Sequence, residues 1–427
     1  MIWGSRWPAG AAVAALGLAV AGAALAQRPR AEDFPAPKPA FAGQTRAPAP
    51  SSASPAVTIQ TLVRGLEHPW AFALLPDGKF LITERTGEMR IATREGIYSA
   101  PLGGVPGIKV VAGQGLHDIE LDPDFAHNRI VYFTYFAPPP GEAPAVWPND
   151  YFYDRVTSKP LAERRLTSIG TERAARARLS DDESKLEQVE TLAEGAERRI
   201  VIAPDATLYV TGADRFRFYD SDMDGVEHEI ADADVLRNFT GRVLRINRDG
   251  SVPRDNPFLA QATVLPETYA YGLRDPEGAA INPSTGELWI AEHGPMGGDK
   301  LSIIRAGGNY GWPNVSYGRQ YSGIPVARGA TAKEGVEQPV YFWYPDIAPS
   351  SLLFYTGKLF PQWRGNAFVG SLVGKALLRL VLDGERVVAE ERLLSELGQR
   401  VRDVRQGADG ALYLLTDDGN LLRLTPK

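Results

Sequence analysis

One short pattern recurs along most of this chain and restricts the folds available to it. In each copy, a turn is followed by a short run of mainly apolar residues, as in residues 76–82 (PDGKFLI) and 286–290 (GELWI). Six copies can be aligned, with their turn positions at residues 78, 125, 206, 286, 365 and 410. A turn followed by a short apolar run indicates a β-strand, so the repetition predicts an all-β chain.

The number of copies predicts the architecture. Six copies between residues 56 and 427 correspond to one copy per 62 residues, which is enough for a four-stranded antiparallel sheet with long loops. Radial repetition of such sheets is typical of a β-propeller, which leaves only short sheet edges to protect. We therefore predict a six-bladed β-propeller of four-stranded antiparallel sheets over residues 56–427. A pair of β-sandwiches or a β-helix is the alternative.

The first 55 residues have a different composition. Arg6, the apolar run 11–25 and the Ala-Leu-Ala sequence at 24–26 are typical of a secretory signal peptide cleaved near Ala26. A permanent membrane anchor is the alternative interpretation of residues 1–26. Residues 27–55 are rich in Pro, Ala and Ser, which predicts an extended or disordered leader. Export of a chain without cysteines favours the periplasm or secretion.

Composition excludes several classes of function. The chain has 46 Lys and Arg against 52 Asp and Glu and no basic stripe, so a nucleic-acid partner is not expected. The absence of cysteine excludes disulfides, thiolate metal sites and cysteine nucleophiles. Since no Gly-x-Ser-x-Gly motif is present, serine hydrolase chemistry is not expected either.

Three motifs between residues 266 and 318 occur in a fixed order. They are YGLRDPEG at 271–278, EHGPMGGD at 292–299 and NYGWP at 309–313. Together they resemble the glucose/sorbosone dehydrogenase family, whose members are soluble quinoproteins and aldose sugar dehydrogenases that use pyrroloquinoline quinone (PQQ). The resemblance covers nearly all of residues 58–424 and also implies a six-bladed propeller. It implies a periplasmic enzyme that oxidises an aldose at C1 with PQQ and Ca²⁺, with an unknown electron acceptor.

The resemblance implies three cofactor-binding arginines. Arg400 and Arg402 match the family's Arg-x-Arg-Asp-Val motif, whose arginines contact PQQ, and Arg274 is the arginine of the first motif. Two arginines at i and i+2 on a strand face the same side, so both can reach one anionic ligand. An ion pair with a neighbouring acid is the alternative for this pair. Lys375 is a further candidate, because Val373 stands where many members carry a lysine that contacts the cofactor.

The expected metal ligands come from two places. Gly294 and Pro295 match the dipeptide whose backbone carbonyls ligate Ca²⁺ in the family, and proline has a carbonyl but no amide donor. Separately, Asp220, Asp222 and Asp224 alternate in the manner of a calcium-binding loop. Position twelve of that loop is an alanine instead of a glutamate, so a solvated acidic loop is the alternative.

Candidate substrate residues are Gln114, Asp214 and Trp343. Gln114 belongs to a run that resembles a family segment near the sugar, and Asp214 ends the Thr-Gly-Ala-Asp sequence of one repeat copy. Trp343 is an aromatic residue that could stack on a sugar or a planar cofactor, although core packing is the commoner role.

The family's general base is missing from its expected position. Members carry a histidine nineteen residues before the aspartate that corresponds to Asp214, and Gly195 stands there in this chain. His117 is the best substitute base, followed by Glu197, although a lone histidine is more often a packed or surface residue. Asp275 is a further departure, since members usually have Asn at that position. These departures leave a second hypothesis open, in which an impaired propeller of the same family serves as a sugar- or protein-binding module.

Overall fold

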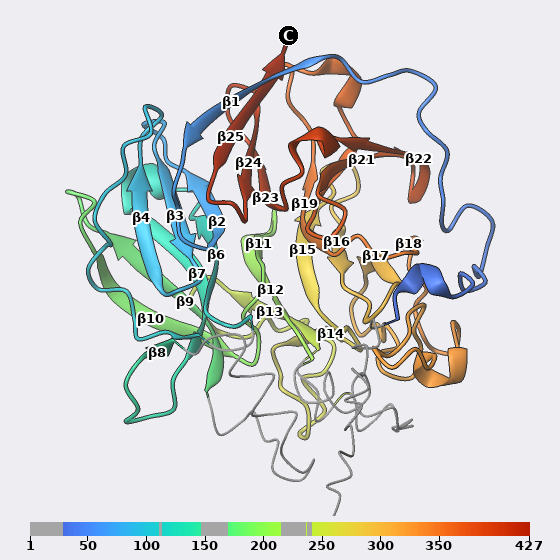
Figure 1. Ribbon diagram of the computed structural model, residues 1–427. Coiled ribbons are helices and arrows are strands. Elements are labelled where there is room, and N and C mark those ends of the chain that lie inside the picture. Colours follow the sequence, from blue (N-terminus) through green and yellow to red (C-terminus); the bar gives the residue numbers. More distant parts are fainter. Residues whose placement is uncertain (1–28, 111–112, 147–169, 215–235, 237–240) are drawn as a thin grey trace, which may run out of the picture.

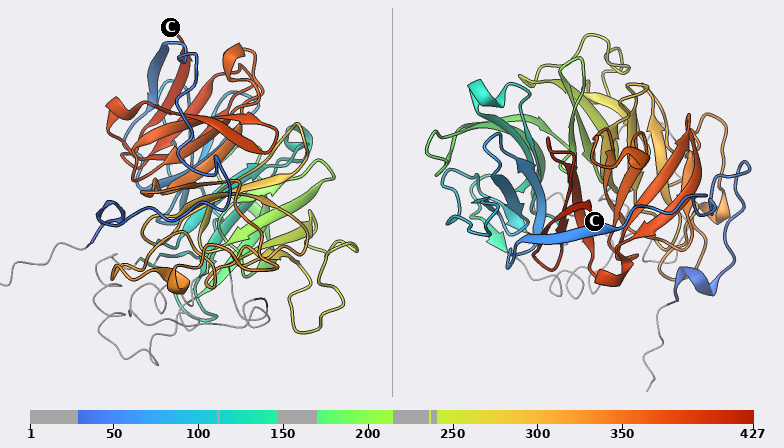
Figure 2. Two further views of the ribbon diagram at one scale, coloured as in Figure 1. Left: turned by 90° about the vertical axis from the view of Figure 1, so that its right-hand side faces the viewer. Right: turned by 90° about the horizontal axis from the view of Figure 1, so that it is seen from above.

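The six-bladed prediction is confirmed. The computed structural model describes residues 29–110, 113–146, 170–214, 236 and 241–427, and in them six β-sheets surround a common axis in chain order (Figure 1; Figure 2). The innermost strands of consecutive blades contact one another, and the first of them, β2, contacts both β6 and β23, which closes the ring.

The strands of each blade follow one another from the axis outward. Blade 1 consists of β2 (Pro69–Leu74), β3 (Phe80–Glu84) and β4 (Glu88–Ala92). Blade 2 consists of β6 (Leu116–Leu121), β7 (Ile130–Ala137), β9 (Thr171–Leu179) and β10 (Leu186–Glu194). Blade 3 consists of β11 (Ile200–Ile202), β12 (Thr207–Gly212), β13 (Arg242–Asn247) and β14 (Thr268–Tyr271).

The second half of the ring has the same order. Blade 4 consists of β15 (Pro276–Ile281), β16 (Leu288–Glu292), β17 (Asp299–Ile304) and β18 (Tyr341–Trp343). Blade 5 consists of β19 (Pro349–Phe354), β20 (Ala367–Ser371), β21 (Ala376–Asp383) and β22 (Arg386–Leu393). Blade 6 consists of β23 (Val401–Gln406), β24 (Leu412–Thr416), β25 (Leu421–Pro426) and β1 (Val57–Val63).

Two blades depart from a simple repeat. Blade 1 has three strands, and a single bridge between Ala92 and Tyr98 takes the place of a fourth among the described residues. In blade 6 the outermost strand is β1, which pairs with β25 although the two come from opposite ends of the chain. Blade 6 therefore joins the two ends of the chain.

The remaining described elements are short. β5 (Lys109–Val110) pairs in parallel with β8 (Ala145–Val146). The helical turns are η1 (Ala31–Asp33), α1 (Phe125–Asn128), η4 (Val326–Gly329), η5 (Pro361–Trp363) and η6 (Ser395–Leu397). Of the helices in the described part of the chain, none is both long and apolar enough to cross a membrane.

The recurring turn has a physical basis in its own residues. The carboxylates of Asp77, Asp205 and Asp409 each accept the backbone N–H two residues further on, which is the geometry of an Asx turn. The next residue is in the left-handed region in each of these copies, with φ of 89° at Gly78 and 69° at Ala206. Glycine adopts this conformation without the steric cost that a Cβ adds.

The apolar run after the turn is buried on both faces because each blade is covered by its two neighbours. In β24, Leu412 and Leu414 pack against blade 5, whereas Tyr413 and Leu415 pack against blade 1. Since successive side chains of a strand point to opposite faces, the run supplies two interfaces at once.

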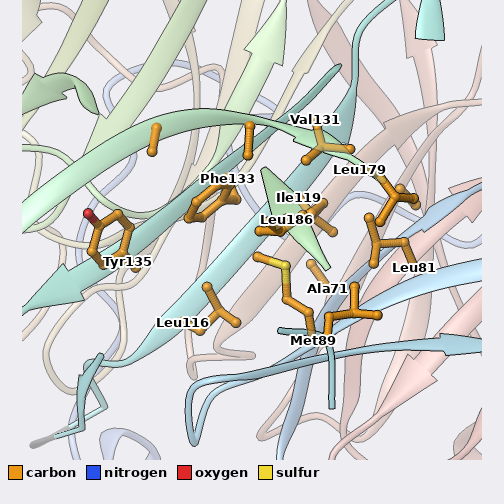
Figure 3. Packing of buried hydrophobic residues seen from close by; sticks show 14 of the residues in the cluster. Ala71, Leu81, Met89, Leu116, Ile119, Val131, Phe133, Tyr135, Leu179 and Leu186 are labelled. Carbon is orange, nitrogen blue, oxygen red and sulfur yellow. The ribbon is translucent and has the colours of Figure 1, made fainter. Parts of the chain in front are cut away.

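Six clusters of buried apolar side chains each fill the space between two consecutive blades. Figure 3 shows the cluster between blades 1 and 2, where Leu81 and Met89 of blade 1 meet Ile119 and Phe133 of blade 2. The core of this protein is therefore a ring of six packed interfaces.

Residues 29–55 belong to the segment for which the composition predicts an extended or disordered leader, and in the structure they are extended. They run in an extended path along the outer edges of blades 4 and 5 and lead into β1 (Figure 1). Ala31 and Gln44 are buried, and the backbone carbonyl of Gln44 accepts the N–H of Phe342. The composition correctly indicated a segment without a core of its own, but it gave no sign of the backbone and side-chain contacts that attach it to the blades. We call residues 29–55 the strap.

Candidate active site

A cavity of about 520 Å³ lies at one end of the propeller axis. It is formed where innermost strands begin and second strands end, so all six blades contribute to it. Its lining residues are His68, Pro69, Trp70, Arg85, Gly113, Arg198, Asp275, Glu277, His293, Leu372, Arg400, Arg402 and Asp417.

The register of the repeat places many of these residues. Arg85, His293, Leu372 and Asp417 each lie seven positions after the turn position of their copy, directly after the second strand of a blade. Ala213 has the same position in blade 3 but does not line the cavity. The register of the repeat is therefore a signal for cavity residues, and it points to Arg85 and Asp417, which the family motifs did not identify.

Arg400 and Arg402 line the cavity and share one carboxylate. Asp417 accepts a hydrogen bond from Arg400 Nε at 2.6 Å and another from Arg402 Nε at 2.8 Å. Both arginines of the i, i+2 pair thus reach one anionic group, which here belongs to the protein. Burial by itself would raise the pKa of Asp417, but Arg402 and Arg400 outweigh burial and lower it.

Arg198 is a buried cavity residue that the sequence interpretation missed. Its guanidinium lies 3.2 Å from Asp275 and 3.2 Å from Glu277. Burial acts to lower the pKa of Arg198, and these two carboxylates more than compensate and raise it. Asp275, one of the departures from the family pattern, therefore has a cation directly beside it. Arg198 lies in the Glu-Arg-Arg run at residues 197–199, which has no sequence pattern that distinguishes a cavity arginine from a surface residue.

Arg85 differs from the other cavity arginines. No carboxylate of the described residues lies within ion-pair distance of its half-buried guanidinium. Burial, and then repulsion from Arg402, lower the pKa of Arg85. An unpaired guanidinium beside other arginines experiences electrostatic repulsion, and an anionic ligand would reduce this repulsion.

Arg274 is placed behind the cavity wall and does not line the cavity. Its guanidinium donates to the carbonyl oxygens of Gly294 at 2.9 Å and His293 at 3.3 Å, and it lies 5.5 Å from the Trp312 ring centroid. Its position thus supports the loop after β16, from which His293 reaches the cavity.

The Gly294–Pro295 dipeptide follows His293 in the same loop but does not line the cavity. The carbonyl oxygen of Gly294 accepts the hydrogen bond from Arg274, and its N–H donates to Asp299. Asp299 in turn accepts the N–H groups of Ile347 and Ala348. Among the described residues, no group of three His, Asp or Glu side chains is arranged to hold a metal ion. Asp220, Asp222 and Asp224 lie outside the described residues.

The candidate substrate residues and Lys375 are not brought together in the cavity lining. Gln114 is buried next to Gly113, and Asp214 accepts a 2.6 Å hydrogen bond from Trp312 Nε1. Trp343 lies on β18, the outermost strand of blade 4, where its Nε1 donates to Glu390. Lys375 is exposed in the turn between β20 and β21.

His117 is fully buried beside the cavity and does not line it. Its Nδ1 lies 2.7 Å from the carbonyl oxygen of Glu197, and its Nε2 lies 3.1 Å from that of Gly113. The ring also packs 5.0 Å from that of Trp70. Glu197 is buried as well, with Oε1 3.6 Å from Arg198 Nε.

Two other histidines, His68 and His293, line the cavity. Neither has a second histidine at a spacing typical of metal ligands in the sequence. The Nε2 of His293 lies 2.8 Å from the carbonyl oxygen of Pro349, and its Nδ1 lies 3.7 Å from Asp275. The cavity thus combines four guanidinium groups, three carboxylates and two imidazoles around a partly apolar wall.

The fold and the cavity define the class of this protein as a six-bladed β-propeller with a charged cavity at its hub. The family within that class is identified by comparison, because residues 66–423 match the family described as Glucose / Sorbosone dehydrogenase. The chain belongs to the glucose/sorbosone dehydrogenase family, a family of sugar-oxidising oxidoreductases.

Individual relatives agree with this assignment. The chain is 36% identical over 390 residues to "Aldose sugar dehydrogenase YliI" of Escherichia coli strain K12, with 88% of this chain and 95% of that protein covered. It is 26% identical over 423 residues to "Quinoprotein glucose dehydrogenase B" of Acinetobacter calcoaceticus, with 84% and 85% covered. It also resembles the crystal structure of the soluble aldose sugar dehydrogenase from Escherichia coli in its apo-form, with a TM-score of 0.73, 33% identity and 87% and 100% of the chains covered.

Proposed function

We propose that this chain is a quinoprotein sugar dehydrogenase that oxidises an aldose at C1 with PQQ as its cofactor. The family and the name of the Acinetobacter calcoaceticus relative support this proposal. The observation that carries it is the convergence of four arginines on one hub cavity. Arg85 comes from blade 1, Arg198 precedes the first strand of blade 3, and Arg400 and Arg402 begin blade 6.

The residues of the cavity fit a planar, polycarboxylate cofactor. Arg85 has no anionic partner among the described residues, and guanidinium groups bind carboxylates with charge-assisted hydrogen bonds. Trp70 and Leu372 add apolar surface to the wall. The volume of about 520 Å³ lies in the range of small-molecule sites.

The chemistry is divided between the cofactor and the chain. When bound, PQQ supplies the two-electron acceptor for oxidation of the sugar. The arginines bind and orient the cofactor carboxylates, and a base takes the proton of the sugar hydroxyl. The cavity imidazoles His68 and His293 are better placed for this task than His117, which lies behind Gly113 and Arg198.

Calcium is a separate part of the proposal. The Gly294 carbonyl binds a guanidinium in the described arrangement, so the dipeptide as placed does not form a cation site. We therefore assign no step to Ca²⁺ and retain it as a prediction of the family resemblance. The dependence of PQQ affinity on added Ca²⁺ and on a chelator would test it.

We also propose that the mature protein begins near residue 27 and acts in the periplasm or outside the cell. The signal-peptide pattern of residues 1–26 supports this proposal, and those residues lie outside the described part of the chain. Determination of the N-terminal residue of the exported protein, after fractionation of the cells that make it, would test it.

Reconstitution of the purified protein tests the function itself. The protein is titrated with PQQ with and without Ca²⁺, and dye reduction is then measured with a panel of aldoses. We expect saturable PQQ binding and aldose-dependent dye reduction, with the lactone or aldonic acid as the product. Tight PQQ binding without turnover would instead identify a binding propeller. If PQQ does not bind, the cofactor proposal fails.

A further inference from the structure

The buried side chain of Arg199, which belongs to blade 3, contacts the other five blades of the propeller. It begins blade 3 immediately before β11, and the exposed fraction of its side chain is 4%. Its guanidinium carbon lies 4.2 Å from the Trp70 ring centroid in blade 1, and its Nη1 lies 3.1 Å from Asp118 in blade 2. The contacts with the other three blades are made by hydrogen bonds to backbone oxygen atoms and an ion pair.

Those contacts involve all three nitrogen atoms of the guanidinium. Nε donates to the carbonyl oxygen of Glu277 in blade 4 at 2.8 Å, and Nη2 donates to that of Ser350 in blade 5 at 2.5 Å. In blade 6, Nη2 lies 3.4 Å from the carbonyl oxygen of Arg402, and Nη1 forms an ion pair with Asp403 at 3.0 Å. With the bond from Nη1 to Asp118, each guanidinium nitrogen has a partner in another blade.

Arg199 also lies between two cavities. The hub cavity is lined by Trp70, Glu277 and Arg402, each of which contacts Arg199 through its ring or its backbone carbonyl. A second cavity of about 260 Å³ lies further along the axis and is lined by Arg199 itself. The guanidinium and its carboxylate partners therefore separate the two cavities.

The charge of Arg199 is balanced locally. Asp118 and Asp403 are both buried, and Arg405 also donates to each of them. Removal of a buried arginine that pairs with carboxylates strongly destabilises the folded protein, because the carboxylates are left as unpaired buried charges. The cluster therefore holds the blades at fixed separations around the axis.

We propose that Arg199 is a positioning residue that sets the spacing of the cofactor-binding side chains across the hub cavity. Glu277 and Arg402 line the cavity from different blades, and the same guanidinium anchors the backbone of both. A planar fork can bind three carbonyls and two carboxylates at once, whereas the point charge of a lysine cannot. This inference rests on the proposed cofactor function, because the consequence for affinity concerns PQQ.

The test compares two conservative substitutions, Arg199→Lys and Arg379→Lys. Arg379 is an equally buried arginine, but it binds Glu391 and Asn366 within blade 5 and lies away from the axis. Both changes keep the positive charge, so neither leaves a buried carboxylate without a cation. Thermal unfolding, PQQ titration and backbone hydrogen exchange are measured for the wild type and both variants.

We expect both variants to unfold at lower temperature, but only Arg199→Lys to weaken PQQ binding, by about tenfold or more. We also expect Arg199→Lys to speed hydrogen exchange in the innermost strands of several blades, whereas Arg379→Lys does so within blade 5 alone. Wild-type affinity in Arg199→Lys, or exchange confined to blade 3, would overturn the inference. If the wild type binds no PQQ, the proposed function fails, and the exchange pattern still decides whether Arg199 couples the blades.

Discussion

At the scale of single residues, the hub cavity contains carboxylates as well as arginines. Asp417 pairs with Arg400 and Arg402, and Asp275 and Glu277 pair with Arg198. Without such partners, three buried or half-buried guanidinium groups would repel one another in a region of low dielectric constant. The carboxylates therefore stabilise the fold around a cavity that is lined by arginines.

The pairing of Asp417 predicts a pH-dependent stability. Its pKa is lower in the folded protein than its ordinary value of about 4. Its stabilising effect is thus complete above that value and is lost as the pH falls through the lower folded pKa. We expect Asp417→Asn to reduce the free energy of unfolding by about 2 kcal/mol at pH 7. The difference from the wild type should shrink as the pH falls below that ordinary value, as measured by urea unfolding over a series of acidic pH values.

The neighbouring Asp418 is exposed and provides the control for this experiment. Asp418→Asn should leave the free energy of unfolding within about 0.5 kcal/mol of the wild type across the pH series. A deficit in Asp417→Asn that stays constant over the whole series would contradict the assigned ion pairs.

A second prediction at this scale concerns the recurring turn. Ala206 occupies, with φ of 69°, the position that glycine occupies in other copies. We expect Ala206→Gly to raise the free energy of unfolding by about 0.5–1 kcal/mol, because the Cβ strain is removed. Ala408, in the corresponding turn of blade 6, does not have a positive φ. Ala408→Gly should therefore not stabilise the protein, and an equal effect of the two changes in thermal unfolding would refute the explanation.

Part of the site could be predicted from sequence at this scale, and part could not. Arg400 and Arg402 were found because they stand two positions apart in a family motif. The register of the repeat points to Arg85, but Arg198 lies in a loop without such a signal, and only the closure of the ring brings both together with the other two. Arg274 matched its motif equally well, yet it supports the cavity wall from behind instead of lining it.

At the scale of elements, the strap explains how the outer edges of two blades are covered. Edge strands expose unpaired backbone groups that can pair with other chains. In the strap, the backbone carbonyl of Gln44 accepts the N–H of Phe342 in β18, and that of Pro48 accepts the N–H of Glu390 in β22. Sequence reasoning missed this role because it weighs apolar periodicity, whereas the strap is attached by hydrogen bonds and by apolar side chains, such as Ala31 and Phe34, that do not recur at a strand period.

Gln44 is the strap residue whose loss should matter most. Its side chain is fully buried, donates to the carbonyl oxygen of Pro339 and accepts the N–H of Ala40. We expect Gln44→Ala to lower the free energy of unfolding by about 1–3 kcal/mol, because buried polar groups lose their partners. Gln60 is exposed on β1 and provides the matched control. Gln60→Ala should change the free energy of unfolding by less than about 0.5 kcal/mol. Equal urea midpoints for the two variants would show that the strap does not contribute to stability.

At the scale of the whole molecule, six blade interfaces and one axial cluster produce the hub cavity. The sequence predicted the ring because its repeat marks the second strand of most blades. It could not predict the cavity in full, because the register of the repeat marks only residues that follow second strands. The remaining lining residues lie near the starts of innermost strands and share no such register. The three-stranded blade 1 was likewise not predicted, since the first copy of the repeat has the same turn and apolar run as the others.

We propose that the hub cavity binds an anionic quinone through its arginines. A substitution of Arg85 tests this proposal. Because Arg85 has no carboxylate partner among the described residues, Arg85→Met does not deprive any described carboxylate of an ion-pair partner. Arg94, an exposed arginine of the same blade, provides the control variant Arg94→Met. The measurement is the dissociation constant of PQQ for the wild type and both variants. We predict an increase of roughly 10- to 100-fold for Arg85→Met and no change for Arg94→Met. An unchanged dissociation constant in Arg85→Met would show that Arg85 does not bind PQQ, which contradicts the proposed role of the cavity arginines.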